Sequence, residues 1–473
     1  MADTTRAATV GPPVEAGPRN TFTGTIKLKL RVPARLRNLE LVLLLFACLI
    51  NGAAVVLVQL GAVGEIRQDV IVLGGGLAVL ALGMHIALRI VAPDADPFIL
   101  PVAIVLNGLG IAEIYRLDLA AKHNGWEAAG VRQIAWTAIA MVIALGVILI
   151  IRNHRVLQRY RYIAMFTGIV LLLLPMLPFI GQSVNGAQLW INLGGFSFQP
   201  GELAKIALAI FFAGYLVESR DSLSLVGKRF LGMQFPRARD LGPILVIWAA
   251  AMAVLIFQRD LGTSLLYFGL FLVMIYVATA RLSWVVLGLA LFIGGAIAAS
   301  QVLSYVAFRF HGWLDAFNPD VYGASGGSYQ LVQGLFGLAH GGLIGTGLGE
   351  GRPQLVPLAE SDYIIASLGE ELGLAGLFAI FALYLVFVSR GMRIGFAGQD
   401  DFGRLLGVGL SFVIALQVFV VVGGVTRVIP LTGLTTPFLA AGGSSLAANW
   451  IIVALLLRLS DSVRNQPRLV VGP

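Results

Sequence analysis

Long apolar runs, separated by shorter polar segments, dominate the chain after residue 38. A helix that crosses a bilayer needs about 17–25 mostly apolar residues, so the pattern predicts an all-α, polytopic membrane protein with about 12 transmembrane helices. The predicted spans are 39–61, 70–92, 97–115, 131–151, 162–180, 202–218, 243–258, 262–280, 283–305, 363–389, 403–423 and 438–459. Two of them, 202–218 and 243–258, are at the short limit.

The composition agrees with this pattern and narrows the class of protein. Of the 473 residues, 58% are hydrophobic and 12% are charged, and the mean hydropathy is +0.87. Soluble proteins carry about 25% charged residues and bury about 75% of the surface of their chains, so a soluble fold could not cover this much apolar area. The sequence therefore excludes a soluble enzyme, a disordered chain and, with its single Cys48, a disulfide scaffold.

Lysine and arginine residues set the expected orientation. They gather in alternate connections between the predicted spans, as is typical of loops on the cytoplasmic side. The basic residues on that side are Arg152, Arg155, Arg159, Arg161, Arg220, Lys228, Arg229, Arg237, Arg239, Arg390, Arg393, Arg404, Arg458, Arg464 and Arg468. Both termini are therefore expected in the cytoplasm, in a multi-pass protein of the cytoplasmic membrane. The net charge of +8 then reflects topology and gives no reason to expect nucleic acid.

Four connections on the opposite, outer side are unusually polar or rich in glycine, namely 181–201, 258–262, 306–362 and 423–437. The connection 306–362 is far longer than the usual connection of about 4–6 residues, and such long loops are mostly functional or disordered. Because it carries many aromatic residues, we expect it to fold back onto the membrane surface.

Asp260 is the first candidate for chemistry. It separates two apolar runs, and a carboxylate at membrane depth is costly enough that it tends to be functional. An exposed loop acid paired with Arg259 is the structural alternative. Glu202 and Lys205 begin another span, where their spacing places them on one helix face and lets them pair. Simple capping of the helix is the alternative there.

Glu370 and Glu371 lie inside a predicted span. Adjacent acids point in different directions on a helix, so one of them is expected to face a polar cavity. The histidines and Cys48 lack the spacing of metal ligands, so no protein metal site is predicted. The glycine run 341–351 lacks the Lys-Ser/Thr ending of a nucleotide-binding loop. These features fit an enzyme acting on a lipid-linked substrate, a transporter or a receptor-like scaffold.

Several motifs resemble, in the same order, those of the SEDS family (RodA, FtsW and SpoVE) across about residues 97–459. The matching segments are Asn185-Gly186-Ala187 to Trp190, Gln199-Pro200-Gly201-Glu202, Asp260-Leu261-Gly262-Thr263, Tyr329-Gln330, Gly341 to Gly349, Gly369-Glu370-Glu371-Leu372-Gly373, Gly423-Gly424-Val425-Thr426, Pro430-Leu431-Thr432-Gly433 and Pro437 to Ser445.

This resemblance implies a peptidoglycan glycosyltransferase that polymerises lipid II into glycan strands at the outer face of the cytoplasmic membrane, for cell elongation or division. Asp260 matches the family's catalytic aspartate, and we expect it to be the general base of an inverting transfer. The residues expected to bind substrate are Glu202, Lys205, Trp190, Arg259, Gln330, Glu370, Thr432, Ser444 and Ser445. The alternatives are a lipid II flippase and a non-catalytic scaffold for a penicillin-binding protein.

The resemblance also implies partners. We expect lipid II, membrane lipid and a class B penicillin-binding protein, and no nucleic acid. The charge of the leaving pyrophosphate is expected to be balanced by Lys205, Arg259, Arg352 or Arg427, or by a divalent cation such as Mg²⁺ or Mn²⁺. Arg259 stands where the family usually has proline, and beside the base it is placed to alter the pKa of Asp260.

The remaining prediction concerns domain organisation. The expected parts are a mostly disordered cytoplasmic tail (1–38), two extra N-terminal helices (39–92), a ten-helix core (93–459) with the outer loop 306–362, and a cytoplasmic tail (460–473). The two extra helices resemble the longer N-terminus of actinobacterial RodA-like members, so a RodA-like role is expected rather than an FtsW-like one.

Overall fold

The computed structural model describes residues 34–69, 71–123, 125–184, 186–193, 196–224, 229–230, 233–234, 241–324 and 326–465. Most of the predicted N-terminal tail, the C-terminal residues 466–473, and the motif residue Asn185 therefore lie outside the described residues. So do Lys228, Arg237 and Arg239 of the orientation argument.

Each of the predicted spans contains a helix. The long helices are α1 (Ala34–Val63), α2 (Gly76–Val91), α3 (Ile99–Ala121), α4 (Ala129–Ile150), α6 (Arg161–Leu173), α7 (Pro200–Ser224), α8 (Gly242–Gln258), α9 (Leu261–Thr279), α10 (Leu282–Val302), α14 (Ile364–Ala397), α15 (Asp401–Val425) and α16 (Gly443–Arg464). Within the described residues, ten helices are long and apolar enough to cross a membrane. The chain is therefore a multi-pass helical membrane protein.

The lengths of individual spans differ from the prediction. The segment predicted as the short span 202–218 is the 25-residue α7, because the helix continues through polar residues such as Arg220 and Asp221. The short apolar helices are instead α8 and the segment Arg161–Met176. The latter ends before residue 180 because Pro175 and Pro178 lack the backbone N–H that would continue a helix.

The first and last long helices extend into the predicted tails. Helix α1 begins at Ala34, where the buried Arg37 pairs with Glu40 at 2.5 Å, one turn further on. Helix α16 continues to Arg464, which forms an ion pair of 2.7 Å with Asp96. Ion pairs allow charged residues to continue a helix beyond its apolar run, and an apolar run alone does not reveal them.

Two small sheets interrupt the helical fold. Strands β1 (Gly181–Val184), β2 (Ala187–Leu193) and β3 (Phe196–Phe198) form an antiparallel sheet in which Gly181 and Phe198 both pair with Ile191. Strands β4 (Arg229–Phe230) and β5 (Met233–Gln234) form a second, shorter sheet. The first sheet lies in the predicted outer segment 181–201, which the sequence left without an element.

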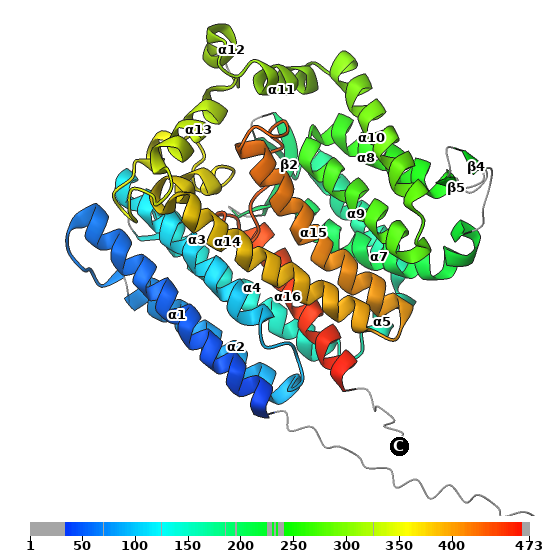
Figure 1. The fold of residues 1–473 in the computed structure, drawn as a ribbon, viewed down its shortest axis with the longest axis horizontal. Helices are drawn as coiled ribbons and strands as arrows, with labels where there is room; N and C mark the ends of the chain where they lie inside the picture. Colours follow the sequence, from blue (N-terminus) through cyan, green and yellow to red (C-terminus); the bar gives the residue numbers. More distant parts are fainter. Residues whose placement is uncertain are drawn as a thin grey trace, which may run out of the picture. The chain divides into compact units, whose positions relative to one another are not determined.

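The connection 306–362 is structured. It contains the end of α11 (Ser304–Leu314), then α12 (Pro319–Gly323), α13 (Tyr329–Gly341) and a short 3-10 turn at Pro353–Leu355. Figure 1 shows α11, α12 and α13 at one end of the bundle and the short helix α5 (Arg155–Arg159) near the other end. The long loop thus forms a layer over one end of the helices.

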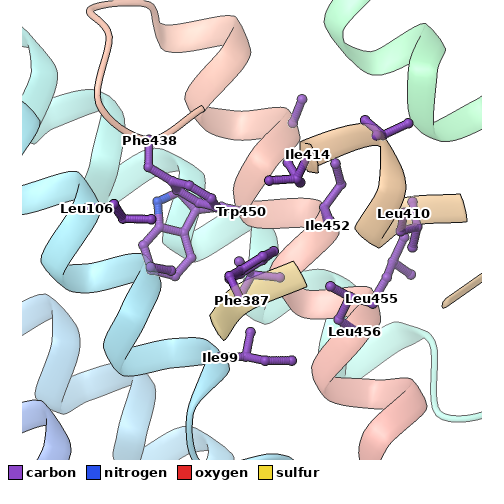
Figure 2. Close-up of a cluster of buried hydrophobic side chains, with 14 of the residues drawn as sticks. Ile99, Leu106, Phe387, Leu410, Ile414, Phe438, Trp450, Ile452, Leu455 and Leu456 are labelled. Carbon is purple, nitrogen blue, oxygen red and sulfur yellow. The ribbon is translucent and has the colours of Figure 1, made fainter. Parts of the chain in front are cut away.

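The hydrophobic core lies where α3, α14, α15 and α16 meet. Figure 2 shows Trp450 of α16 facing Leu106 of α3, with Phe438 and Phe387 nearby. The ring of Phe438 packs edge-on against Trp450 and Phe387, with centroid distances of 6.2 and 5.7 Å. In an apolar stretch of 18 residues, 94% of α3 is buried, against 28% of α10. Helix α3 is therefore central, and α10 faces the lipid.

Candidate functional site

A break between two helices places Asp260. Helix α8 ends at Gln258, and Arg259 adopts the left-handed conformation with φ 57°, which turns the chain. Asp260 then caps the first turn of α9, accepting a hydrogen bond of 3.0 Å from the backbone nitrogen of Thr263. The Thr263 hydroxyl donates a second bond to the same carboxylate. The break predicted at this position is therefore confirmed, and its cause is an N-cap.

The Asp260 carboxylate is almost fully buried, with 4% of the residue exposed. Burial raises the pKa of Asp260, while the bonds from Thr263 and the positive charge of Arg309 act in the opposite direction. Asp362 is a further electrostatic neighbour, and its pKa is raised to about 6, mainly by burial. The site therefore contains two carboxyl groups and a nearby guanidinium.

A large cavity lies beside this group. Its volume is about 1160 Å³, and residues of α11, α12, α13 and of the segments before α14 and α16 line it. The polar residues in the lining are Arg259, Ser304, Tyr305, Arg309, Trp313, Tyr322, Ser328, Tyr329, Gln330, Asp362 and Tyr363. Asp260 itself lies behind this lining, next to Arg259 in sequence and to Arg309 and Asp362 in space.

The two arginines of the lining are held differently. Arg309 donates from one nitrogen to the backbone oxygens of Leu431 and Thr432, at 3.2 and 3.1 Å. The guanidinium of Arg259 lies 5.7 Å from the ring centre of Tyr305. Both present positive charge to the cavity, which makes it suited to an anionic ligand. Thr432 contributes its backbone oxygen here, and its side chain is buried.

Glu202 and Lys205 form a buried polar cluster. The Lys205 ammonium donates to Glu202 at 2.6 Å, to Gln417 at 3.0 Å and to Asn449 at 3.2 Å. The predicted pairing on one face of α7 is therefore confirmed. Neither residue lines the cavity.

Tyr267 of α9 connects this cluster with Asp260. Its hydroxyl donates to the backbone oxygen of Gly201 at 2.8 Å, in the first turn of α7. Asp260 and Glu202 are both its electrostatic neighbours. The two candidate acids of the sequence are therefore both close to one buried tyrosine.

Three more predicted residues lie around the start of α7. The Ser444 hydroxyl accepts a bond of 2.8 Å from the backbone nitrogen of Gln199. The Ser445 hydroxyl accepts from Thr435 at 3.0 Å and from Asn449 at 3.3 Å, so it belongs to the Lys205 cluster. Trp190 is half-buried on β2, opposite Gln182 of β1.

Glu370 lies in a different part of the fold. Its carboxylate accepts a bond of 2.8 Å from the backbone nitrogen of Arg352 and lies 3.1 Å from His340. Glu371 pairs with Arg116 of α3 at 2.9 Å. Neither acid lines the cavity beside Asp260, so the structure does not bring Glu370 to that site. The reason is that backbone and basic groups of α3, α13 and the following loop occupy both carboxylates.

Sequence reasoning did not single out Arg309 or Tyr267, and it left Asp362 and the motif residue Thr263 without a role. Arg309 carried a usable signal, because it is a basic residue in a segment predicted to be outside, like Lys205. Arg427, which was expected as a cation for the substrate, instead donates to the backbone oxygens of Trp313 and Leu314, at 2.7 and 2.5 Å. Its role is to hold α11.

Among the described residues, no group of three or more histidine, cysteine, aspartate or glutamate side chains could hold a metal ion. The divalent cation expected with the leaving pyrophosphate stays a prediction, because Mg²⁺ is commonly held by one or two carboxylates together with substrate phosphates. The positive charge available at the cavity is that of Arg259 and Arg309.

Comparison with known proteins identifies the family. The FtsW, RodA and SpoVE family, described as "Cell cycle protein", matches residues 98–465. The chain belongs to this family. It is 46% identical to the peptidoglycan glycosyltransferase RodA of Mycobacterium tuberculosis H37Rv, over 92% of this chain and 93% of that protein. It is 35% identical to the stage V sporulation protein E of Bacillus subtilis, over 61% of this chain and 76% of that protein.

Solved structures of the family share the fold. A structure titled "Structural coordination of polymerization and crosslinking by a peptidoglycan synthase complex" is similar, with a TM-score of 0.60 and 23% identity, covering 79% of this chain and 99% of that one. The rod shape determining protein RodA of Thermus thermophilus has a TM-score of 0.52 and 24% identity, covering 79% of this chain and 98% of that one. The high identity to mycobacterial RodA agrees with the actinobacterial, RodA-type resemblance of the sequence.

Proposed function

We propose that this chain is a peptidoglycan glycosyltransferase that polymerises lipid II, with Asp260 as the general base. The observation that carries the proposal is the burial of Asp260 behind a cavity of about 1160 Å³ whose lining includes Arg259 and Arg309. The 46% identity to mycobacterial peptidoglycan glycosyltransferases over 92% of the chain supports the same activity.

The proposed reaction forms one glycosidic bond and breaks one bond to phosphate. The acceptor 4-hydroxyl attacks the anomeric carbon of the donor while its proton passes to the Asp260 carboxylate. The bond from that carbon to the pyrophosphate breaks, and the electron pair leaves with the pyrophosphate. Because the donor is α-linked and the product β-1,4-linked, a single inverting displacement needs one base and no covalent intermediate. A positioned base contributes about 10²–10⁴-fold to the rate.

Arg259 and Arg309 are the proposed counter-charges for the leaving pyrophosphate. Both line the cavity, and Arg309 also faces Asp260 and Asp362. Fixed guanidinium groups stabilise developing negative charge without reorganising during the reaction. Lys205 is a weaker candidate, because Glu202, Gln417 and Asn449 already surround its ammonium.

The proposed orientation places the cavity at the outer face of the cytoplasmic membrane and both termini in the cytoplasm. Basic residues support this arrangement. Arg155 lies in α5, at the end opposite α11–α13, and pairs with Asp400 of the turn between α14 and α15, which Arg390 and Arg404 flank. A lipid-linked sugar anchored in the outer leaflet would then reach the cavity from the bilayer. We also propose a class B penicillin-binding protein as the partner that crosslinks the product, on the basis of the family resemblance.

The test is polymerisation of fluorescent lipid II by the purified full-length protein with its transpeptidase partner. Asp260→Asn should lower the rate of chain formation by about 10²–10⁴-fold. Asparagine is as good an N-cap as aspartate, so the start of α9 should be preserved and the loss assigned to the base. An Asp260→Asn protein that polymerises at the normal rate would disprove the role of Asp260. Transfer of lipid II across the membrane without polymer would support the flippase, and neither activity would support the scaffold.

A further inference from the structure

The N-terminal helices α1 and α2 precede the part of the chain that the family profile matches, residues 98–465. Helix α1 lies along α3, as Figure 1 shows. Polar contacts fix it there along its length. Asn51 donates to the backbone oxygen of Ile104 at 2.9 Å, and Gln59 donates to the hydroxyl of Tyr115 at 2.9 Å. Buried polar contacts of this kind fix register more strictly than apolar packing does.

The end of α1 reaches the loop that joins α13 to α14. We call residues 342–351 the glycine loop. A Cβ atom added to Gly61 of α1 would lie 2.4 Å from the backbone oxygen of Leu348 in this loop. A Cβ atom added to Gly349 would lie 2.6 Å from the backbone oxygen of Val58. Two backbones therefore meet directly, and only glycine permits that approach on either side.

Helices α3 and α14 hold the other side of the glycine loop. Glu371 accepts a bond of 2.8 Å from the backbone nitrogen of Gly349, and its carboxylate also pairs with Arg116. Arg116 donates in turn to the backbone oxygen of Gly351 at 2.7 Å. The glycine loop is thus clamped between α1 on one side and the Arg116–Glu371 pair on the other.

The glycine loop follows α13 directly, and α13 contributes to the cavity. Tyr329, Gln330 and Leu331, in the first turn of α13, all line it. The last residue of α13, Gly341, packs against the backbone of α14, since its Cβ would lie 2.1 Å from the oxygen of Gly369. A shift of the glycine loop would therefore move α13 and with it one wall of the cavity.

We propose that α1 braces the glycine loop, so that α13 is held in place for substrate binding, with Gly61 as a positioning residue. Gly61 touches no atom of the cavity and acts through Leu348 and Gly349. The kinetic part of the inference rests on the proposed function, whereas the structural part does not. The inference also gives a role to α1, which lies outside the part of the chain that the family profile matches.

The test compares Gly61→Ala with Gly52→Ala in the full-length protein in lipid nanodiscs. Both glycines lie in α1, but a Cβ at Gly52 would meet nothing within 4 Å. Gly61→Ala should raise hydrogen exchange in the glycine loop and α13 while leaving α16 unchanged. It should also raise the KM for lipid II and its directly measured Kd by about tenfold, with a smaller change in kcat. Gly52→Ala should leave all of these values as in the unmodified protein.

Other outcomes would overturn the brace. They are unchanged exchange in Gly61→Ala, raised exchange with an unchanged Kd for lipid II, or equal effects of Gly52→Ala and Gly61→Ala. Hydrogen exchange and the Kd for lipid II can be measured without turnover, so they test the brace even in a protein that forms no glycan chains. Failure of the unmodified protein to form glycan chains would count against the proposed function and not against the brace. If Gly61→Ala does not fold, Gln59→Leu replaces it. This variant loses the bond to Tyr115 at the same end of α1 and should change exchange and Kd in the same direction.

Discussion

Thr263 donates two hydrogen bonds to the carboxylate of Asp260, one from its backbone nitrogen at 3.0 Å and one from its hydroxyl. The proposed base is therefore also the N-cap of α9, and both of its oxygens are engaged. An acceptor hydroxyl has to replace or share one of these bonds to deliver its proton. The hydroxyl bond is the easier one to give up, because the backbone bond is part of the helix start.

The hydroxyl bond of Thr263 leads to a prediction about pH. It favours the ionised form of Asp260 and so opposes the increase in pKa that burial causes. In Thr263→Val the pKa of Asp260 should therefore rise. A general base works only when it is deprotonated, so the acid limb of the pH–rate profile should move to higher pH. The measurement is the initial rate of lipid II polymerisation from pH 5 to 9, and an acid limb at unchanged pH would contradict the prediction.

The buried pair of Lys205 and Glu202 should matter for stability. Lys205→Met leaves Glu202 as an unpaired buried charge, which should cost about 3–5 kcal/mol of unfolding free energy. The double variant with Glu202→Gln should recover part of this loss, because no uncompensated charge remains. Thermal unfolding in detergent measures both. Glu218→Gln is the control, since its pair with Arg161 is exposed and such pairs contribute about 0–1 kcal/mol. Equal stability of Lys205→Met and the unmodified protein would rule out a structural role for the pair.

His154, just before α5, contacts Asp400, which lies between α14 and α15 at the end opposite the cavity. His154 Nε2 is 3.0 Å from both carboxylate oxygens of Asp400. The hydrogen bond with His154 is the main cause that lowers the pKa of Asp400 to about 2. Because the pKa of Asp400 is lower in the folded than in the unfolded state, its ionised form stabilises the fold. This stabilisation is complete above the unfolded pKa of about 3.9 and is lost as the pH falls through about 2.

Asp400→Asn should therefore lower the thermal midpoint at pH 7, and the difference from the unmodified protein should shrink between about pH 4 and pH 2. Asparagine keeps the N-cap bond to Gly403, so the variant isolates the charge. The neighbouring Asp401→Asn is the control, because Asp401 is exposed. A difference in midpoint that stays constant over this pH range would show that the charge is not the cause.

Glu113 of α3 is fully buried, and neither of its carboxylate oxygens has a hydrogen-bond partner among the described residues. A buried polar group without a partner costs about 1–3 kcal/mol, so Glu113→Leu should raise the thermal midpoint. Glu371→Leu should lower it, because that change removes the partner of Arg116 and of the Gly349 nitrogen. If Glu113→Leu destabilises the protein as much as Glu371→Leu does, Glu113 binds a partner such as a buried water.

The sequence predicted the membrane class and nearly every span, because each helix that crosses the membrane must itself present apolar side chains to the lipid. It also predicted the helix break at Asp260 and the pairing of Glu202 with Lys205, both of which depend on residues a few positions apart. Through the family resemblance it predicted the activity. It missed the sheet at 181–198, because those strands depend on pairing with one another and not on an apolar run.

The tertiary structure alone decided which polar residues share a site. Arg309 and Asp362 follow Asp260 by 49 and 102 residues in the chain, yet both are its electrostatic neighbours. Glu370 was expected at the same site and instead lies with Arg352 and His340. These groupings follow from the way α11, α13 and α14 pack over one end of the bundle. A buried charged group needs a partner within hydrogen-bond distance. The packing of the helices determines which residue becomes that partner, and the neighbours of the group in the sequence do not.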